Sequence, residues 1–233
     1  MGLVCKILKW MVGLYLASSY KSVPGAYFVR FYYAIFPLVF GPAISGKKDT
    51  ENIKKLQANK LSAMGYVEYS TYASPMECDF YFHKNNATYF TELDVSRGEL
   101  MCRILQKLFI ESKRYPFIPV ANVFTNFLKE IKPFETYRVA SNVMCWDEKW
   151  LYVSSRFTKK IKGKEVLCSF SLTKYVLKDG RKTIPPQEAL EFCGLYNEEV
   201  ERISQDNYKI LVQESGFHDT TLLEEMKYDY LKL

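Results

Sequence analysis

The chain has 233 residues, of which 48% are hydrophobic and 16% aromatic, and this composition excludes a globally disordered protein. Nine lysines and arginines stand against two acids in residues 1–60, so that stretch carries +7 and the remainder sums to −1. A nucleic-acid-binding domain normally carries a basic face on its folded body, so this asymmetry argues against nucleic acid as a partner. The six cysteines are scattered without a C-x-x-C or Cys/His cluster, and we expect free thiols and no metal site.

We expect residues 1–60 to form an apolar and basic segment ahead of a body at 61–233. Two apolar runs dominate the segment, at 8–17 and at 23–45, and the second contains Arg30. The first is shorter than the roughly 20 residues that cross a bilayer, and prolines interrupt the second. Their aromatic density favours a membrane interface, reached by one span or by a tilted hairpin. The alternative is an extension that packs on the protein's own body.

The body begins with strand-forming residues that run from about residue 63 to Phe82 and are broken by Ser74 and Pro75. From Asn86 the apolar spacing becomes helical and predicts one long helix to about Ser112. The residues expected on one face of this helix, with Arg97 interrupting the row, are Phe90, Leu93, Met101, Ile104 and Leu108.

Four strand patterns follow the predicted helix, at 117–131, 136–146, 150–161 and 164–177. The third and fourth are joined by a turn at Lys162 and Gly163. Alternation in the second strand predicts one face made of Tyr137, Val139, Ser141, Val143 and Cys145.

Two further helices are predicted, near 186–193 and 197–216, and Gly216 is positioned to cap the second. A strand region, a long apolar helix and then four antiparallel strands indicate an α+β fold in which the sheet wraps the helix.

The region around the helix start contains a recognisable motif. Residues 79–89 read DFYFHKNNATY, with Asp94 and Arg97 beyond them. This motif resembles the D-x-x-G-H-x-N-N-x-x-Y…D-x-x-R signature of the 4-hydroxybenzoyl-CoA-thioesterase-like (hotdog) proteins. CWDEKWLYVSSRF at 145–157 and the stretch from YNEEVERI to QESGFHD at 196–219 resemble the thioesterase superfamily member 6 group of that family.

The resemblance implies a hotdog fold and hydrolysis of an acyl-CoA thioester, with coenzyme A as part of the substrate and no further cofactor. It implies Asp79 as nucleophile or general base, with His83 and Asp94 as further catalytic candidates. The amino end of the central helix would polarise the thioester carbonyl. The residues implied in substrate binding are Asn85, Asn86, Ala87, Thr88 and Arg97.

The resemblance also implies a homodimer or higher hotdog oligomer and attachment to the endoplasmic reticulum membrane through the N-terminal segment. The lysines that follow the second apolar run place the body on the cytosolic side. A soluble cytoplasmic protein is the alternative.

Each candidate residue also has a structural interpretation. Asp79 fits a turn or a helix cap, His83 fits a loop residue bonded to backbone, and the asparagines suit turn and cap positions. The spacing of Asp94 and Arg97 fits a local ion pair on one helix face.

Two positions depart from the family signature. Phe82 stands where many relatives have glycine, and Tyr81 replaces a polar residue that assists catalysis in some relatives. These changes leave a second hypothesis open, a non-catalytic hotdog protein that binds acyl-CoA or lipid or acts as a scaffold at a membrane. A dehydratase-type hotdog, for which His83 and Asp94 would act together, is a third.

Overall fold

A computed structural model describes residues 2–112, 116–213, 220–226 and 230–233. The helices along the chain are α1 (Leu3–Ser18), η1 (Tyr20–Ser22), α2 (Ala26–Ile35), α3 (Phe40–Ser45), α4 (Glu51–Ala58), η2 (Ser62–Met64), η3 (Pro75–Glu77), α5 (Asn86–Ile104), α6 (Gln106–Glu111), α7 (Pro186–Cys193), α8 (Glu198–Gln213) and α9 (Thr221–Glu225). The strands are β1 (Tyr66–Tyr72), β2 (Val120–Phe127), β3 (Thr136–Trp146), β4 (Trp150–Ile161), β5 (Lys164–Asp179) and β6 (Lys182–Ile184).

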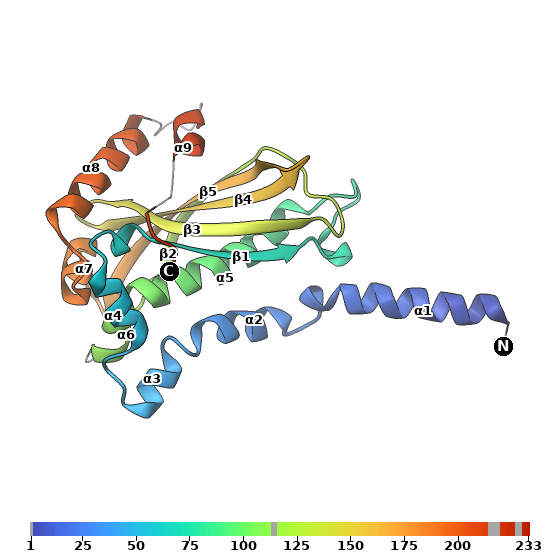
Figure 1. Ribbon diagram of the computed structural model, residues 1–233, viewed down its shortest axis with the longest axis horizontal. Coiled ribbons are helices and arrows are strands. Elements are labelled where there is room, and N and C mark those ends of the chain that lie inside the picture. The colour runs from blue at the N-terminus through green and yellow to red at the C-terminus, as the bar shows by residue number, and fades with distance from the viewer. Residues whose placement is uncertain (1, 113–115, 214–219, 227–229) are drawn as a thin grey trace.

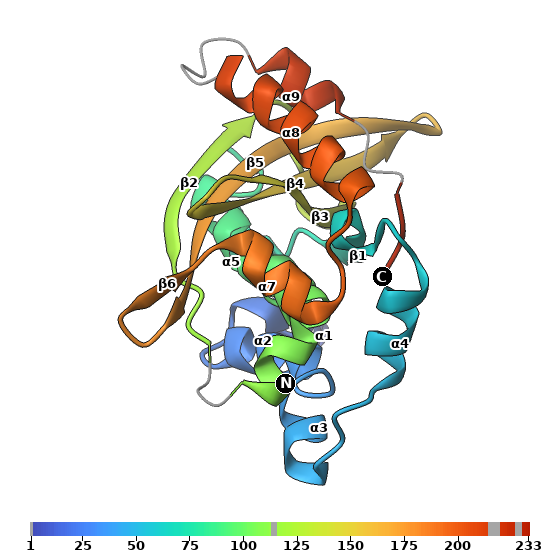
Figure 2. The same cartoon turned by 90° about the vertical axis from the view of Figure 1, so that its left-hand side faces the viewer.

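The strands form an antiparallel sheet in the order β1-β3-β4-β5-β2, and β6 pairs with the end of β5. Helix α5 lies along one face of this sheet, while α8 and α9 cover the other (Figures 1 and 2). The predicted α+β architecture, with a sheet wrapped around one central helix, is confirmed. The predicted turn at Lys162 and Gly163 joins β4 to β5.

The central helix buries an apolar face against the sheet. Tyr89, Leu93, Ser96 and Leu100, spaced by three or four residues, are all at most 2% exposed. Ser96 shares a 2.7 Å hydrogen bond with Ser141 of β3, so Ser141 lies on the helix-facing side of the sheet. The outer face of the sheet has its own apolar cluster, which joins β3, β4 and β5 to α8 and α9.

Three sequence predictions are corrected by the structure. Phe90 is 40% exposed and Tyr89 is buried instead, because the apolar row starts one residue earlier than expected. The long helix breaks at Leu105. Beyond the break, the buried side chain of Gln106 donates to the carbonyl of Leu38 at 2.5 Å and ties the chain to the N-terminal segment.

The third correction is that Cys145 does not share the face of Val143. A β-bulge places Val143 opposite Val153 but Cys145 opposite Tyr152, so one extra residue lies between them on β3. Cys145 therefore packs in the cluster beneath α8. All six cysteines are free thiols, as predicted.

The N-terminal helices differ in how they contact the rest of the protein. Helix α1 extends away from it (Figure 1) and has no buried residue. Helix α2 packs on the side of α5 that faces away from the sheet. Gly98 of α5 allows this contact, because a Cβ there would come within 2.6 Å of the Phe31 ring. Leu56 of α4 belongs to the main core.

No helix in the described part of the chain is both long and apolar enough to cross a membrane. The predicted cap at Gly216 lies outside the described residues.

Candidate active site

The motif at residues 79–89 forms a tight corner between η3 and α5. The amide of Asp79 donates to the carbonyl of His83 at 3.0 Å, and the amide of Phe82 donates back to the carbonyl of Asp79 at 3.0 Å. The side-chain oxygen Oδ1 of Asp79 accepts from the amide of Tyr81 at 2.9 Å, which is an Asx-type turn. The structural interpretation of Asp79 as a turn residue is therefore confirmed, and it leaves the second oxygen, Oδ2, without a hydrogen-bond partner among the described residues.

Phe82 adopts the left-handed backbone conformation, with φ at 57°. Glycine occupies this conformation without steric cost, so the family's glycine at this position fits the corner that the structure forms. The phenylalanine ring is 78% exposed and Tyr81 is 76% exposed, so neither ring covers Asp79. Phenylalanine in place of the family's glycine at position 82 therefore raises the backbone energy of the corner, while the Asp79 carboxylate stays accessible.

The amino end of α5 directly follows the corner. Asn85 is the N-cap, and its side chain accepts from the amide of Ala87 at 2.9 Å. The hydroxyl of Thr88 donates to the carbonyl of Asn85 at 2.7 Å. Asn86 and Ala87 are exposed on the first turn, where backbone amides point out of a helix. Asn85 and Thr88 thus have structural roles, and Asn85 also occupies the Ala87 amide. The exposed first turn therefore offers the Asn86 amide to a ligand.

His83 lies beside Asp79. Its Nδ1 is 3.6 Å from Oδ1 of Asp79, which is longer than a hydrogen bond, and its ring stacks on Tyr81 with an interplanar angle of 12°. The side chains of Asp79 and His83 are 24% and 35% exposed. The corner therefore brings together a carboxylate, an imidazole and a helix amino end, all accessible to solvent.

Asp94 and Arg97 lie elsewhere. Asp94 follows Asn86 by eight residues, which is about 12 Å along the helix axis. Arg97 is almost fully buried and donates to Asp94 at 2.6 Å and to Thr173 of β5 at 2.6 Å. Burial and the nearby charge of Asp94 raise the pKa of Tyr27 on α2. These two residues form the local ion pair that the spacing allowed, and a single copy of the chain does not bring them to the Asp79 corner.

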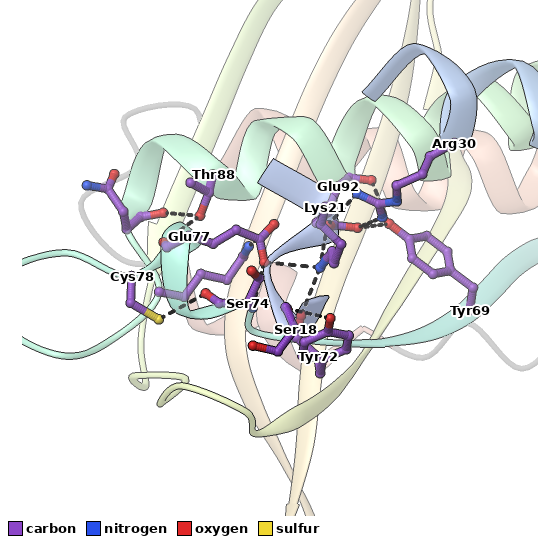
Figure 3. A network of polar contacts seen from close by, with 12 residues as sticks. Ser18, Lys21, Arg30, Tyr69, Tyr72, Ser74, Glu77, Cys78, Thr88 and Glu92 are labelled. Atoms are coloured by element: carbon purple, nitrogen blue, oxygen red, sulfur yellow. Dashed lines mark hydrogen bonds and ion pairs between the residues drawn. The ribbon is translucent and has the colours of Figure 1, made fainter. Parts of the chain in front are cut away.

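Sequence reasoning missed a buried cluster of charges behind the corner (Figure 3). Its centre is Glu92 of α5, whose side chain is fully buried. Arg30 of α2 binds both oxygens of Glu92, at 3.0 and 2.5 Å, and Lys21 approaches to 2.8 Å. Tyr69 of β1 donates to the same carboxylate at 2.6 Å. Burial alone would raise the pKa of Glu92, but Arg30 and Lys21 outweigh it and lower the pKa to about 2.

Glu77 extends the cluster to the corner. It lies 3.1 Å from Lys21 and 3.5 Å from Lys84, and it accepts from the amide of Ser74 at 2.9 Å. Burial lowers the pKa of Lys84. Within the described residues its ammonium has no hydrogen bond, and its contact with Glu77 is the 3.5 Å ion pair. The hydroxyl of Tyr137 is also buried without a partner there.

The cluster, which we call the buried charge cluster, comprises Lys21, Arg30, Lys84, Glu77 and Glu92 and carries a net charge of +1. It ties the N-terminal segment to η3 through Glu77 and to α5 through Glu92, the two elements that flank the corner. One signal in the sequence pointed to it, because a lone Arg30 within an apolar run requires a buried partner or an exit to solvent.

The described residues contain no group of three or more His, Cys, Asp or Glu side chains that could hold a metal ion.

Comparison with known proteins identifies the family. Residues 73–191 match the family model of the Thioesterase-like superfamily. The chain belongs to this family. A probable thioesterase of Saccharomyces cerevisiae is 63% identical over 227 residues, which are 97% of each chain. The thioesterase poxG of Penicillium oxalicum is 31% identical over 81% of this chain and 72% of its own.

Two weaker similarities were also found. Protein THEM6 of Xenopus laevis is 29% identical over 89 residues, which are 38% of this chain and 42% of the frog protein. A solved mutant 4-hydroxybenzoyl-CoA thioesterase, in complex with 4-hydroxybenzoyl-CoA, has 12% identity and a TM-score of 0.46, covering 55% of this chain and 98% of its own. The predicted membership of the thioesterase-like hotdog family is confirmed by the family model and by the yeast relative.

Replacing Lys21 by Met should destabilise the protein by about 3–5 kcal/mol, because Glu77 and Glu92 would stay buried with fewer cationic partners. Urea unfolding measures the change. The matched control is Lys54→Met, which breaks an ion pair with Asp49 whose side chains are 64% and 68% exposed and should leave stability nearly unchanged. Equal midpoints for the two variants would contradict a stabilising role of the cluster.

Replacing Phe82 by Gly should stabilise the protein by roughly 0.5–1 kcal/mol, because relief of the left-handed backbone exceeds the added entropy of the unfolded chain. The control is Phe80→Gly, which removes a ring that is 90% exposed from ordinary backbone and should destabilise. Thermal unfolding of both variants checks the prediction, and a lower midpoint for the Phe82 variant would refute it.

Proposed function

We propose that this protein hydrolyses the thioester of a fatty acyl-CoA at the Asp79 corner. The observation that carries the proposal is the position of a partly exposed carboxylate, with one oxygen free of protein partners among the described residues, immediately before the exposed amino end of α5. A thioester carbonyl needs an activated water or a carboxylate nucleophile, together with donors for the developing oxyanion. Family membership supports the same reaction class.

In the proposed step, Asp79 takes a proton from water, and the hydroxide formed attacks the thioester carbon. The carbonyl oxygen becomes an oxyanion that the Asn86 amide, at the amino end of α5, stabilises. The carbon–sulfur bond then breaks, the coenzyme A thiolate leaves, and it takes up the proton that Asp79 holds. His83, beside Asp79, can relay this proton. No cofactor beyond the substrate is required.

The proposed active form is a homodimer, or a higher oligomer built from it. Within the described residues, strand β2 pairs only with β5 and leaves one edge of the sheet open, whereas the opposite edge strand β1 also bonds to Leu231 and Leu233. An open edge is a template for pairing with a second sheet. A second copy joined in this way is also the route by which Asp94 of one protomer could approach the corner of the other.

The protein is further proposed to act in lipid metabolism at the cytosolic face of the endoplasmic reticulum membrane, with α1 as its attachment. Helix α1 exposes ten large hydrophobic residues, contains two lysines and has no acid. Exposed apolar surface of this extent marks an interaction site, and such a helix suits the membrane interface. The Asp79 corner adds three exposed aromatic side chains, Phe80, Tyr81 and Phe82.

A non-catalytic protein that binds acyl-CoA or lipid, or acts as a scaffold, is the second candidate. One observation favours it: Oδ1 of Asp79 is engaged in the Asx turn, so the carboxylate has a structural role without any chemistry. Saturable binding of acyl-CoA without turnover would distinguish this candidate from a hydrolase.

The Asp79→Asn variant should lower kcat for acyl-CoA hydrolysis by at least about a hundredfold, because the amide cannot accept the proton of water. The variant should still fold, since the asparagine oxygen can accept the Tyr81 amide as the aspartate does. Turnover of butyryl- to palmitoyl-CoA, followed by thiol release, is the measurement. The control is Asp206→Asn, which removes an exposed carboxylate on α8. Unchanged turnover in the Asp79 variant would refute the mechanism, and absence of turnover in the parent protein would refute the activity.

Deleting residues 2–18 should release the protein from phospholipid vesicles while leaving the fold intact, because Lys21 and its ion pairs remain. Vesicle flotation compares the full chain with the truncated chain, and circular dichroism verifies folding. A full chain that stays in the unbound fraction, or a truncated chain that still floats, would contradict attachment through α1.

A further inference from the structure

Exposed aromatic rings gather at the end of the body that contains the Asp79 corner. Residues 80–82 of the corner present three rings that are 90%, 76% and 78% exposed, and Phe134, in the loop between β2 and β3, is 60% exposed. The Phe134 amide donates to the carbonyl of Ala73 at 2.8 Å, and the Lys84 amide donates to the carbonyl of Ile131 at 2.7 Å. These two bonds hold the loop and the corner side by side.

The turn between β4 and β5 lies at the same end. The ammonium of Lys159 pairs with Glu135 at 2.6 Å and donates to the carbonyl of Glu130 at 2.7 Å, which ties the turn to the loop that carries Phe134. Three further lysines around the turn are exposed and form no ion pair within the part of the chain that the structure describes, namely Lys160, Lys162 and Lys164.

The carboxylates at this end do not neutralise these three lysines. Lys132 is likewise exposed and in no ion pair among the described residues, which makes four such lysines against the carboxylate of Asp79, an excess of three positive charges. The other accessible carboxylates each pair with a separate cation, Glu130 with Lys129, Glu135 with Lys159 and Glu165 with Arg138. Aromatic rings combined with excess positive charge are complementary to the interface of an anionic membrane.

Strained backbone is concentrated at this end. Among the described residues, the non-glycine residues with a positive φ are Phe82 at 57°, Phe134 at 66° and Lys162 at 50°. The left-handed conformation is unfavourable for a bulky side chain, and the two phenylalanine rings are exposed, so packing within the protein does not offset its cost. Strain that internal packing does not explain indicates a function for the exposed side chains.

Helix α1 leaves the body at the same end. The hydroxyl of Tyr72, the last residue of β1, donates to the carbonyl of Ser18, the last residue of α1, at 2.7 Å. From this contact α1 extends beyond the end of the sheet (Figure 1). A bilayer that takes up α1 is therefore next to the aromatic rings and the unpaired lysines.

We propose that this end of the body docks on the surface of an anionic phospholipid bilayer. The rings enter the interface between headgroups and hydrocarbon chains, and the lysines face the lipid phosphates and carboxylates. The contact adds to α1 and does not replace it, because stable attachment usually combines an apolar anchor with a basic patch. We call this surface the aromatic–basic end, and it comprises Phe80, Tyr81, Phe82, Lys132, Phe134, Lys160, Lys162 and Lys164.

Docking turns the Asp79 corner toward the lipid, because residues 80–82 belong to both surfaces. The substrate class that follows is an acyl-CoA whose hydrocarbon chain is already inserted in the bilayer, a step that rests on the hydrolysis proposed above. The docking itself requires no turnover, so it is tested without acyl-CoA.

The test measures the affinity of the full chain for vesicles of phosphatidylcholine and of a phosphatidylcholine–phosphatidylserine mixture. Replacing Lys160, Lys162 and Lys164 together by Gln should lower the affinity for the anionic vesicles at least about tenfold, which corresponds to roughly 1.4 kcal/mol. Each lysine close to an anionic surface strengthens binding about fivefold, so tenfold is a lower bound for three. Affinity for the neutral vesicles should stay that of the parent protein.

The matched control replaces Lys178, Arg181 and Lys182 together by Gln. It removes the same charge from the opposite end of β5 and from the turn to β6. Because that end lies farther from the proposed contact than salt lets charges interact at physiological ionic strength, the control should bind both kinds of vesicle as the parent does.

The aromatic part is tested with Phe134→Asn, which should weaken binding to both kinds of vesicle about fivefold, or roughly 1 kcal/mol, a fraction of the transfer free energy of a phenylalanine side chain. Asparagine tolerates the left-handed backbone, so the variant should keep its fold. The control is Phe117→Asn, whose ring is 64% exposed beside Lys178 at the far end of β5 and whose loss should leave binding unchanged.

Three outcomes would overturn the proposal. The first is equal affinity of the two triple variants for anionic vesicles. The second is equal binding of the Phe134 and Phe117 variants. The third is a change in sedimentation of the Phe134 variant with unchanged vesicle binding, which would mean that a second copy of the chain covers this end. Absence of thioesterase turnover would refute the proposed hydrolysis and leave these affinities as they are.

Discussion

The ion pairs of Glu92 with Lys21 and Arg30 are the interaction on which the rest of the structure depends. A fully buried carboxylate is tolerated only when cations and hydrogen bonds replace its water, and both cations come from the N-terminal segment. The segment is thus part of the folded protein around α5. Because the pKa of Glu92 is lowered, the contribution of these pairs to stability is present above the usual titration range of a glutamate and is lost as the pH falls toward 2.

The same interaction positions the candidate site. Lys21 also binds Glu77, which precedes Asp79 by two residues and accepts from the Ser74 amide. The amide of Asn85, after the corner, donates to the carbonyl of Glu77 at 2.8 Å. Both ends of the corner are therefore fixed from behind by buried polar contacts, while its front, with Asp79 and the first turn of α5, stays open to solvent. A fixed back and an open front are what the role proposed for Asp79 requires, because a reacting carboxylate must be both held in place and accessible to substrate.

Periodicity and family resemblance predicted the order of strands and helices, the central helix and the corner, because these follow from local patterns and short turns. Asn85 as a helix cap was predictable for the same reason. The bulge that separates Val143 from Cys145 was not, since a single inserted residue leaves the alternation in the sequence unbroken.

The charge cluster could not be predicted because it depends on contacts distant in sequence, since Arg30 and Glu92 are 62 positions apart. The break at Leu105 has a similar origin, since Gln106 bonds to Leu38 across 68 residues. Composition showed that residues 1–60 are apolar and basic, but it could not separate α1, which is exposed, from α2, which is packed on α5. That division depends on small features such as Gly98, where the missing Cβ admits a ring.

The long separation between Lys21 and its carboxylate partners has a consequence for synthesis. Lys21 and Arg30 leave the ribosome well before Glu77 and Glu92, because translation adds only about 5–20 residues each second. For several seconds α2 therefore has no α5 to pack against, and the ion pairs that hold it there cannot form. The N-terminal segment can close onto the body only after residues 77–92 have been made.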